Sequence, residues 1–160
     1  MRDYYDHAPV RIPRTPIVVS GSAGSRYDAI ARIVGGLTSL PLLTVPDLIV
    51  HATGKCAQRV RDEDGETALL RAFEESTQRA LESTPFGLVV LPPEALTQDR
   101  IARMVRSAVL VAVRREFESD DPRVLAALDT AVLSMLAGAP DHAIALQIVR
   151  TLELDDERLR

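Results

Sequence analysis

The chain of 160 residues contains one cysteine, no tryptophan and, among its 19 basic residues, only one lysine, Lys55. The single cysteine, Cys56, excludes an intrachain disulfide framework and a metal site built from several cysteines. No apolar run approaches the roughly 20 residues that a membrane-spanning helix needs, and the first residues lack the apolar segment of a secretory signal. We therefore expect a cytoplasmic protein without membrane insertion.

The charge and the histidines also limit the classes of function. A formal net charge of -4 gives no electrostatic reason to expect a nucleic-acid partner. His7, His51 and His142 are scattered along the chain, and their spacing does not match a metal-binding pattern, so we predict no metal site. With 46% hydrophobic and 26% charged residues, the composition is typical of a globular protein that buries one core.

The first 15 residues carry Pro9 and Pro13 and show no apolar periodicity. They predict an extended N-terminal arm before a single domain over residues 16–160. The arm holds two of the three tyrosines, Tyr4 and Tyr5. It is either a free tail or a segment that docks on a partner, because tyrosines are enriched at protein interfaces.

Short apolar strands alternate with helical patterns over residues 16–113. The last two apolar runs are continuous rather than alternating, as parallel strands buried on both faces are. This order predicts an α/β fold with a three-layer parallel sheet of about four to five strands flanked by helices. The predicted strands cover residues 16–20, 42–45, 87–91 and 108–113.

The last third of the chain has a different pattern. Apolar residues recur at helical spacing over residues 122–137 and again over 141–154, with a Gly-Ala-Pro breaker between them. The pattern predicts a C-terminal helical hairpin over residues 122–154. Leu133 and Leu146 contribute to its apolar surface, which either packs on the sheet or serves self-association or partner binding.

A glycine-bearing loop over residues 21–25 follows the first predicted strand, where ligands bind in open α/β sheets. A phosphate-binding loop reads G-x-x-x-x-G-K-[ST], in which backbone N–H groups and the lysine hold phosphates and the hydroxyl holds magnesium. In register from Gly21, the second glycine falls on Arg26 and the lysine falls on Tyr27. The Ser/Thr position falls on Asp28.

These replacements act against nucleotide binding. Arg26 is less able than glycine to adopt a positive φ, and Tyr27 carries no charge. Asp28 puts an anion at the helix N-terminus, where phosphate oxygens would lie. We therefore expect no cofactor, with ATP and magnesium disfavoured. The residues that could still bind an anion weakly are Gly21, Ser22, Gly24, Ser25 and Arg26.

A second set of motifs follows the second predicted strand, namely Leu48-Ile49, Thr53-Gly54-Lys55 and Asp64-Gly65-Glu66. With these motifs in register, residues 16 to about 113 resemble shikimate kinase, a small P-loop kinase of the nucleoside-monophosphate-kinase type. That family commonly has Asp-x-Asp-x-x-Ile-Glu, then Gly-x-Ser-Ile, then a Gly-Glu pair before an Arg-bearing helix. The spacing from the first glycine to the Gly-Glu pair fits without a gap.

The resemblance also shows which working residues are missing. The family's two acidic positions after the second strand, used for magnesium and substrate, fall on Thr44 and Pro46, with Asp47 one place away. The substrate-binding arginine after the Gly-Glu pair falls on Leu70, next to Arg71.

Further departures follow the third and fourth predicted strands. Leu91-Pro92-Pro93-Glu94 replaces the glycine-rich turn that touches substrate in the family, and proline cannot supply N–H groups there. The arginine-bearing lid is not evident, although Arg114, Arg115 and Arg123 are candidates for its remnants. The predicted hairpin stands where the family has a closing strand and helix.

We interpret the chain as a non-catalytic shikimate-kinase-like pseudoenzyme without catalytic residues. It would be a protein-binding, structural or regulatory module in a bacterial assembly, contacting a partner or a second copy through the arm or the C-terminal helices. One alternative is a divergent small-molecule phosphotransferase, with Arg26 acting for the lysine and Asp28 or Asp47 on magnesium. The other is a metabolite sensor that uses the former substrate cleft.

Overall fold

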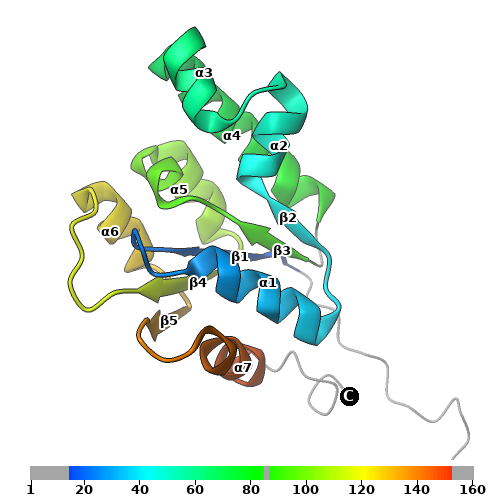
Figure 1. Ribbon diagram of the computed structural model, residues 1–160, viewed down its shortest axis with the longest axis vertical. Helices are drawn as coiled ribbons and strands as arrows, with labels where there is room; N and C mark the ends of the chain where they lie inside the picture. The colour runs from blue at the N-terminus through cyan, green and yellow to red at the C-terminus, as the bar shows by residue number, and fades with distance from the viewer. Residues whose placement is uncertain (1–14, 85–86, 153–160) are drawn as a thin grey trace, which may run out of the picture.

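The protein folds around a parallel sheet of five strands (Figure 1). The strands are β1 (Ile17–Gly21), β2 (Leu42–Thr44), β3 (Leu88–Val90), β4 (Val109–Arg114) and β5 (Leu133–Leu136). Their order across the sheet is β2-β3-β1-β4-β5. The computed structural model describes residues 15–84 and 87–152. The central strands are continuous, almost wholly buried runs, so the predicted α/β fold with a parallel sheet is confirmed.

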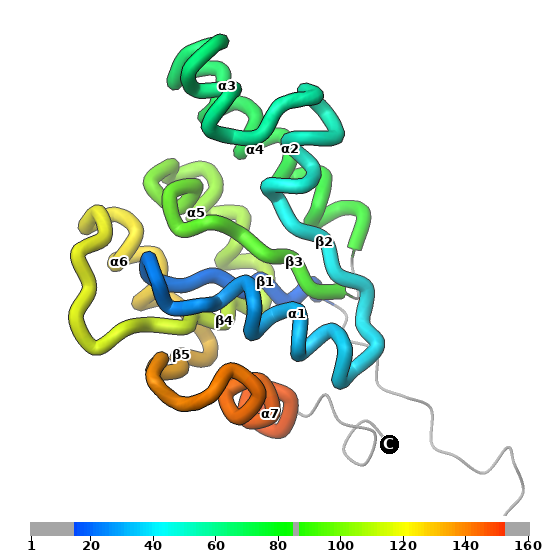
Figure 2. Tube along the Cα trace, viewed as in Figure 1, coloured from blue at the N-terminus to red at the C-terminus, as the bar shows by residue number. Residues whose placement is uncertain are grey.

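Helices cover both faces of this sheet, which gives three layers. On one face lie α1 (Tyr27–Thr38) and α7 (Asp141–Thr151), packed against each other (Figure 2). On the other face lie α4 (Glu66–Ser83), α5 (Asp99–Arg106), α6 (Pro122–Leu128) and the 3₁₀ helix η1 (Pro93–Thr97). Beyond β2 lie α2 (Val45–Thr53) and α3 (Ala57–Asp64), which pack on α4.

The side chains of β1 alternate between two apolar cores. Val18 packs with Val89 and Leu110 in the core beneath α4, α5 and α6. Ile17 and Val19 belong to the opposite core, beneath α1 and α7. Because β3 and β4 flank β1, the turn after β1 emerges at the centre of the carboxyl-terminal end of the sheet.

The predicted helical hairpin over residues 122–154 is wrong in its first half. The helix α6 ends at Leu128, and residues 133–136 form β5, which pairs in parallel with β4. The Val132 amide donates to the Leu110 carbonyl at 2.9 Å, so β5 satisfies an edge of β4 that would otherwise be unpaired. A short apolar run fits the periods of helix and strand alike, and here strand pairing decides. The closing strand and helix that we expected to be missing are therefore present.

The residues singled out for partner binding lie in different parts of the chain. Tyr4 and Tyr5, the tyrosines of the predicted arm, lie outside the described residues. Leu133 is a half-buried residue of β5 packed on the core beneath α1 and α7, and Leu146 is a half-buried residue of α7. Among the helices of residues 15–84 and 87–152, none has the length and apolar character to cross a bilayer.

Candidate functional site

The loop between β1 and α1 keeps the backbone conformation of a glycine-rich turn. Gly24 has a φ of 77° and Arg26 a φ of 63°, so both lie in the left-handed region. Arg26 thus adopts the conformation that we expected to favour glycine at its position, at a cost of about 1–2 kcal/mol relative to the usual region. The side chain has changed at this position, whereas the path of the backbone remains that of a tight turn.

Gly21 allows the loop to close on itself. A Cβ atom at this position would lie 2.3 Å from the Val113 carbonyl oxygen and 2.4 Å from Ser25 Oγ, so a larger residue does not fit without a shift. Ser25 Oγ lies across the loop over Gly21, and it is buried without a hydrogen-bond partner. A buried hydroxyl without a partner is costly, which makes Ser25 notable in a loop of this kind.

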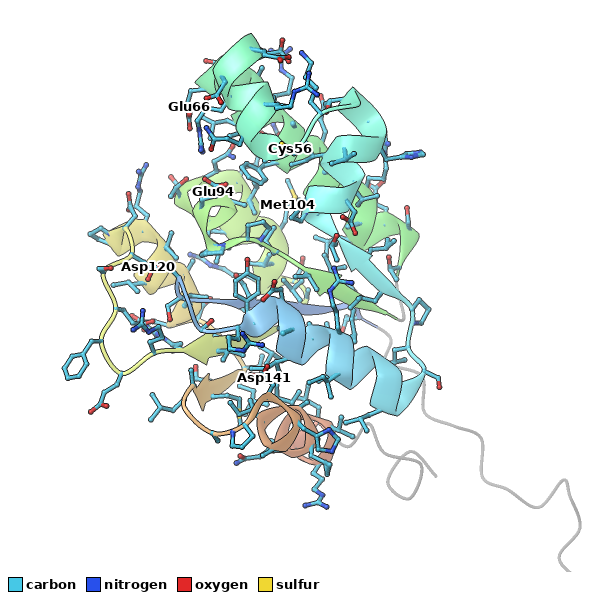
Figure 3. The ribbon with its side chains drawn as sticks, in the orientation of Figure 1. Cys56, Glu66, Glu94, Met104, Asp120 and Asp141 are labelled. Atoms are coloured by element: carbon cyan, nitrogen blue, oxygen red, sulfur yellow. The ribbon has the colours of Figure 1, made fainter. Side chains whose placement is uncertain are left out.

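The carboxylate of Asp120 accepts a hydrogen bond from a backbone amide of this loop (Figure 3). The Ala23 amide donates to both carboxylate oxygens of Asp120, at 3.0 and 3.3 Å. Nearby, Ser22 Oγ accepts a 2.9 Å hydrogen bond from the Arg115 amide, and the Ser25 amide donates to the Ser22 carbonyl at 3.1 Å. Part of the donor set that a bound anion would use therefore serves contacts within the chain.

The cation of the loop is also paired internally. Arg26 Nε donates to the two carboxylate oxygens of Asp141 at 3.0 and 2.9 Å, and an Arg26 NH2 atom lies 2.8 Å from Asp141 Oδ2. This hydrogen bond raises the pKa of Arg26 and lowers the pKa of Asp141. Asp141 is the first residue of α7. The charge at position 26 is thus directed toward α7 and not held free for a phosphate.

Tyr27, at the lysine position of the pattern, is half-buried and uncharged. Burial raises the pKa of its phenol to about 12, with smaller contributions from the charges of Asp28 and Glu94. The side chain therefore remains a neutral phenol at physiological pH. Asp28 lies in the first turn of α1, where it favours the positive end of the helix dipole and repels an incoming anion.

A segment over residues 115–121, which we call the strap, carries Asp120 to the loop. Arg114 anchors it through a bidentate pair with Glu118, with distances of 2.8 and 3.1 Å, and through a contact with Asp129. At its other end the Asp121 side chain caps α6 by accepting from the Arg123 amide at 2.8 Å. The strap is therefore tied to the end of β4 and to the start of α6.

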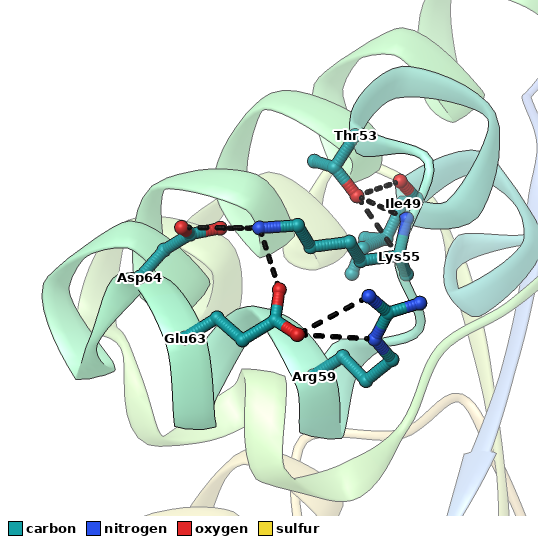
Figure 4. A network of polar contacts seen from close by, with 6 residues as sticks. All are labelled: Ile49, Thr53, Lys55, Arg59, Glu63 and Asp64. Atoms are coloured by element: carbon teal, nitrogen blue, oxygen red, sulfur yellow. Dashed lines mark hydrogen bonds and ion pairs between the residues drawn. The ribbon is translucent and has the colours of Figure 1, made fainter.

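The charged residues of the other predicted motifs form a separate group of ion pairs around α3 (Figure 4). Lys55 pairs with Glu63 at 2.8 Å and with Asp64 at 3.1 Å. Arg61 pairs with Glu66 at 2.9 Å and with Glu94 on η1 at 2.7 Å. The one lysine of the chain therefore pairs with acidic side chains of α3.

The positions expected to be acidic after β2 serve the local fold instead. Thr44 is the N-cap of α2, and its side chain accepts a hydrogen bond from the Asp47 amide at 3.2 Å. Pro46 is the second residue of this helix, where proline is tolerated. Asp47 is exposed in the first turn. Within the described part of the chain, no three His, Cys, Asp or Glu side chains gather in a way that could hold a metal ion.

A cavity of about 450 Å³ lies on the outer side of the loop. It joins the strap to the start of α7, and three of the five predicted anion-binding residues line it. Its lining includes Gly24, Ser25, Arg26, Arg115, Phe117 and Asp141. The other two predicted residues, Gly21 at the end of β1 and Ser22 directly after it, are buried and do not line the cavity.

Sequence reasoning missed Asp120 and the pairing of Asp141 with Arg26. Asp120 precedes a helix cap, and nothing in that pattern signals a contact with a loop 97 positions away. Taken together, the residues at this loop do not fit a nucleotide with magnesium. A carboxylate stands at the Ala23 amide, and the lysine and hydroxyl positions hold Tyr27 and Asp28.

Comparisons with known proteins bear on the fold. No family model matches the chain, and no curated protein matches it by sequence. Solved structures do match. The shikimate kinase from Aquifex aeolicus has a TM-score of 0.76 at 12% identity, over 86% of this chain and 96% of that one. A shikimate kinase from Acinetobacter baumannii, in complex with shikimate, has a TM-score of 0.72 at 12% identity, over 89% and 94%.

The match extends to more distant kinases. The APS kinase CysC from Mycobacterium tuberculosis, as a Cys556Ala mutant, has a TM-score of 0.52 at 14% identity, over 88% of this chain and 98% of that chain. At these identities the likeness concerns the fold, and the chain has the fold of the shikimate kinases.

Proposed function

We propose that the protein is a non-catalytic relative of the shikimate kinases and acts as a protein-binding, structural or regulatory module in the cytoplasm. The state of the loop carries the proposal, because the Ala23 amide donates a hydrogen bond to Asp120 and the Arg26 guanidinium forms an ion pair with Asp141. Phosphoryl transfer depends on backbone N–H groups and a cation aimed at the phosphates. In this chain the Ala23 amide is hydrogen-bonded to Asp120, and the Arg26 guanidinium is paired with Asp141.

The surroundings of the loop support the same proposal. Tyr27 offers no positive charge. Its phenol, with a pKa of about 12, is neutral at physiological pH and would become negative if it lost its proton. Thr44 and Pro46 offer no carboxylate for magnesium or for a substrate hydroxyl. Catalysis of this kind rests on charges placed before the reaction, and the positions that would supply them are here neutral or paired.

The test is a phosphotransfer assay on the full chain with magnesium-ATP, shikimate and a panel of small hydroxylated acceptors. A shikimate kinase with the intact loop pattern serves as the positive control. The expected result is no turnover above the enzyme-free rate, and no micromolar affinity for magnesium-ATP by calorimetry. Turnover that follows the protein through purification, or a saturable micromolar affinity, would overturn the proposal.

The part of the proposal that concerns a partner rests on exposed apolar residues. Leu136, the last residue of the edge strand β5, is 63% exposed, and Val132, directly before the strand, is 69% exposed. A partner or a second copy is expected to cover these side chains, because an edge strand with exposed apolar side chains readily associates. Light scattering on the wild type and on Val132→Ser/Leu136→Ser tests self-association. Affinity capture with and without residues 1–15 tests the arm with Tyr4 and Tyr5.

A second candidate function is metabolite sensing. The cavity of about 450 Å³ beside the loop favours it, because its size suits a small ligand. The sensor that we considered from the sequence would use the former substrate cleft, whereas this cavity lies between the loop, the strap and the start of α7. A thermal-shift screen with metabolites distinguishes the two functions, since a bound ligand raises the melting temperature. No shift at millimolar ligand would favour the protein-binding module.

A further inference from the structure

The contact between Asp120 and the loop covers a backbone donor that an anion could otherwise use. The Ala23 amide faces the two Asp120 oxygens in the manner in which such an amide would face two oxygens of a phosphate. Ser25 Oγ, buried and without a partner, lies inside the same loop over Gly21. The loop therefore holds one donor satisfied by a carboxylate and one hydroxyl that nothing in the described chain satisfies.

The start of α1 adds further donors at the same place. The Ile30 amide is the first of this helix to bond backward, to the Arg26 carbonyl at 3.0 Å, and the N-cap residue supplies no side-chain bond. The amides of the first turn are thus directed outward without an intrahelical acceptor, as they are at helix N-termini that bind oxyanions. Gly24 also presents its backbone to the cavity, with the Arg115 side chain beside it.

We propose that the loop over residues 21–28 is an oxyanion site that the protein keeps closed with the carboxylate of Asp120, so that a phosphate-class anion binds when Asp120 is withdrawn. The ion pair of Arg26 with Asp141 also acts against anion binding, because it holds the positive charge of Arg26 on the carboxylate of α7. The strap supplies the means of control. A partner or ligand that draws Asp120 away from the loop would free the Ala23 amide, while the Arg115 amide could keep its hydrogen bond to Ser22.

This inference concerns binding, so it is independent of whether the wild type transfers phosphate. Phosphotransfer by the wild type would overturn the proposed function, whereas the masked site is judged from anion affinity in variants. The probes are inorganic phosphate, pyrophosphate and magnesium-free ATP, measured by calorimetry. ATP binding no tighter than pyrophosphate assigns the site to free oxyanions, and tighter ATP binding assigns it to nucleotides.

The variants are Asp120→Ala, which frees the Ala23 amide, and Asp120→Asn, which keeps an acceptor but removes the charge. Glu75→Gln is the matched control, because it removes one negative charge from an exposed site on α4. We expect Asp120→Ala to bind pyrophosphate about tenfold more tightly than the control or better, the effect of freeing one charge-assisted donor. Asp120→Asn should show a smaller gain in the same direction, and it replaces the alanine variant should that fail to fold.

The site of binding is read from backbone amide resonances. In Asp120→Ala, pyrophosphate should shift the amide signals of Ala23 and Ser25 in a saturable way, whereas the Glu75→Gln protein should show no such shift. Asp141→Asn combined with Asp120→Ala should bind more tightly again, because Arg26 is then released. Equal affinities in the Asp120 variants and in the control, or shifts confined to residues outside the loop, would overturn the proposal.

Discussion

The loop after β1 and the helix α3 both carry charged side chains, but they are tied to the fold in different ways. Contacts of the loop join segments far apart in the chain, with Asp120 97 and Asp141 115 positions from their partners. Those of α3 are mostly local, such as Arg59 with Glu63 four positions away and Lys55 with Asp64 nine positions away (Figure 4). We infer that the tertiary structure holds the loop in place, whereas the ion pairs of α3 lie on the surface of a helix and contribute little to the fold.

The largest difference in stability between the loop and the α3 region is expected when a glycine of each is replaced by alanine. Gly21→Ala places a Cβ 2.3 Å from the Val113 carbonyl oxygen, inside the sheet, and should lower the free energy of unfolding by about 3 kcal/mol. Gly54→Ala, at the end of α2, meets no atom within 4 Å and strains only its φ of 73°, which costs about 1 kcal/mol. Urea denaturation of both variants measures the difference.

Gly36→Ala is the control for these glycines, because it lies inside α1 with no neighbour within 4 Å. It should leave stability unchanged or raise it by up to about 1 kcal/mol. If Gly21→Ala were no more destabilising than Gly54→Ala, the close packing of the loop against β4 would be contradicted.

The next largest difference in stability between the two regions is expected when a hydrogen-bonded hydroxyl group is removed. Ser22 is fully buried, and its Oγ accepts from the Arg115 amide at 2.9 Å, so Ser22→Ala leaves that amide without its acceptor and should cost about 1–2 kcal/mol. Thr53→Ala removes comparable contacts to Ile49 and Lys55, but at an exposed site, and should cost about 0.5 kcal/mol. Thermal unfolding of the two alanine variants tests this order, and the reverse order would count against a structural role for the strap contact.

Tyr27, which follows the loop, should make the stability of the protein depend on pH. Its folded pKa of about 12 lies above the ordinary phenol value of about 10, mainly because the side chain is buried, so the folded state favours the protonated phenol. The stabilisation is complete below pH 10 and is lost as the pH rises from 10 toward 12. Stability should therefore fall more steeply with pH in this window in the wild type than in Tyr27→Phe. Parallel curves would show that Tyr27 is not buried as described.

The smallest effect is expected for an ion pair of the α3 region. Arg61→Gln breaks the pairs with Glu66 and Glu94 at the surface, and should lower the free energy of unfolding by less than about 1 kcal/mol. Salt should weaken the effect further, because it screens exposed charges. Denaturation at low and high salt measures it, and a large loss that salt does not reduce would mean that Arg61 holds η1 in place.

The sequence predicted the central strands because they are continuous apolar runs, as the buried segment Val109–Arg114 illustrates. It failed for residues 131–137, where the same apolar residues fit a helix and a strand. That ambiguity is resolved only by the open edge of β4, a partner distant from this run in the sequence. Strand pairing is a tertiary interaction, so local periodicity could not decide between the two.

The candidate site was predicted in part. The order of strand, glycine loop and helix located residues 21–28 and identified Arg26, Tyr27 and Asp28 as departures from a phosphate-binding pattern. Asp120 and the role of Asp141 could not be predicted, because only the folded sheet brings them beside the loop. The left-handed φ of Arg26 was also unexpected, since the sequence shows the side chain but not the backbone path that neighbouring elements impose.

The central claim is that the loop is closed by the chain's own carboxylates, and the Ala23 amide reports on it most directly. The measurement is a titration of the isotope-labelled wild type with magnesium-ATP, following the amide signals of Ala23 and Ser25. The account predicts that neither signal shifts up to millimolar nucleotide, because Asp120 already occupies the Ala23 amide. A saturable shift of both signals with a micromolar midpoint would contradict it.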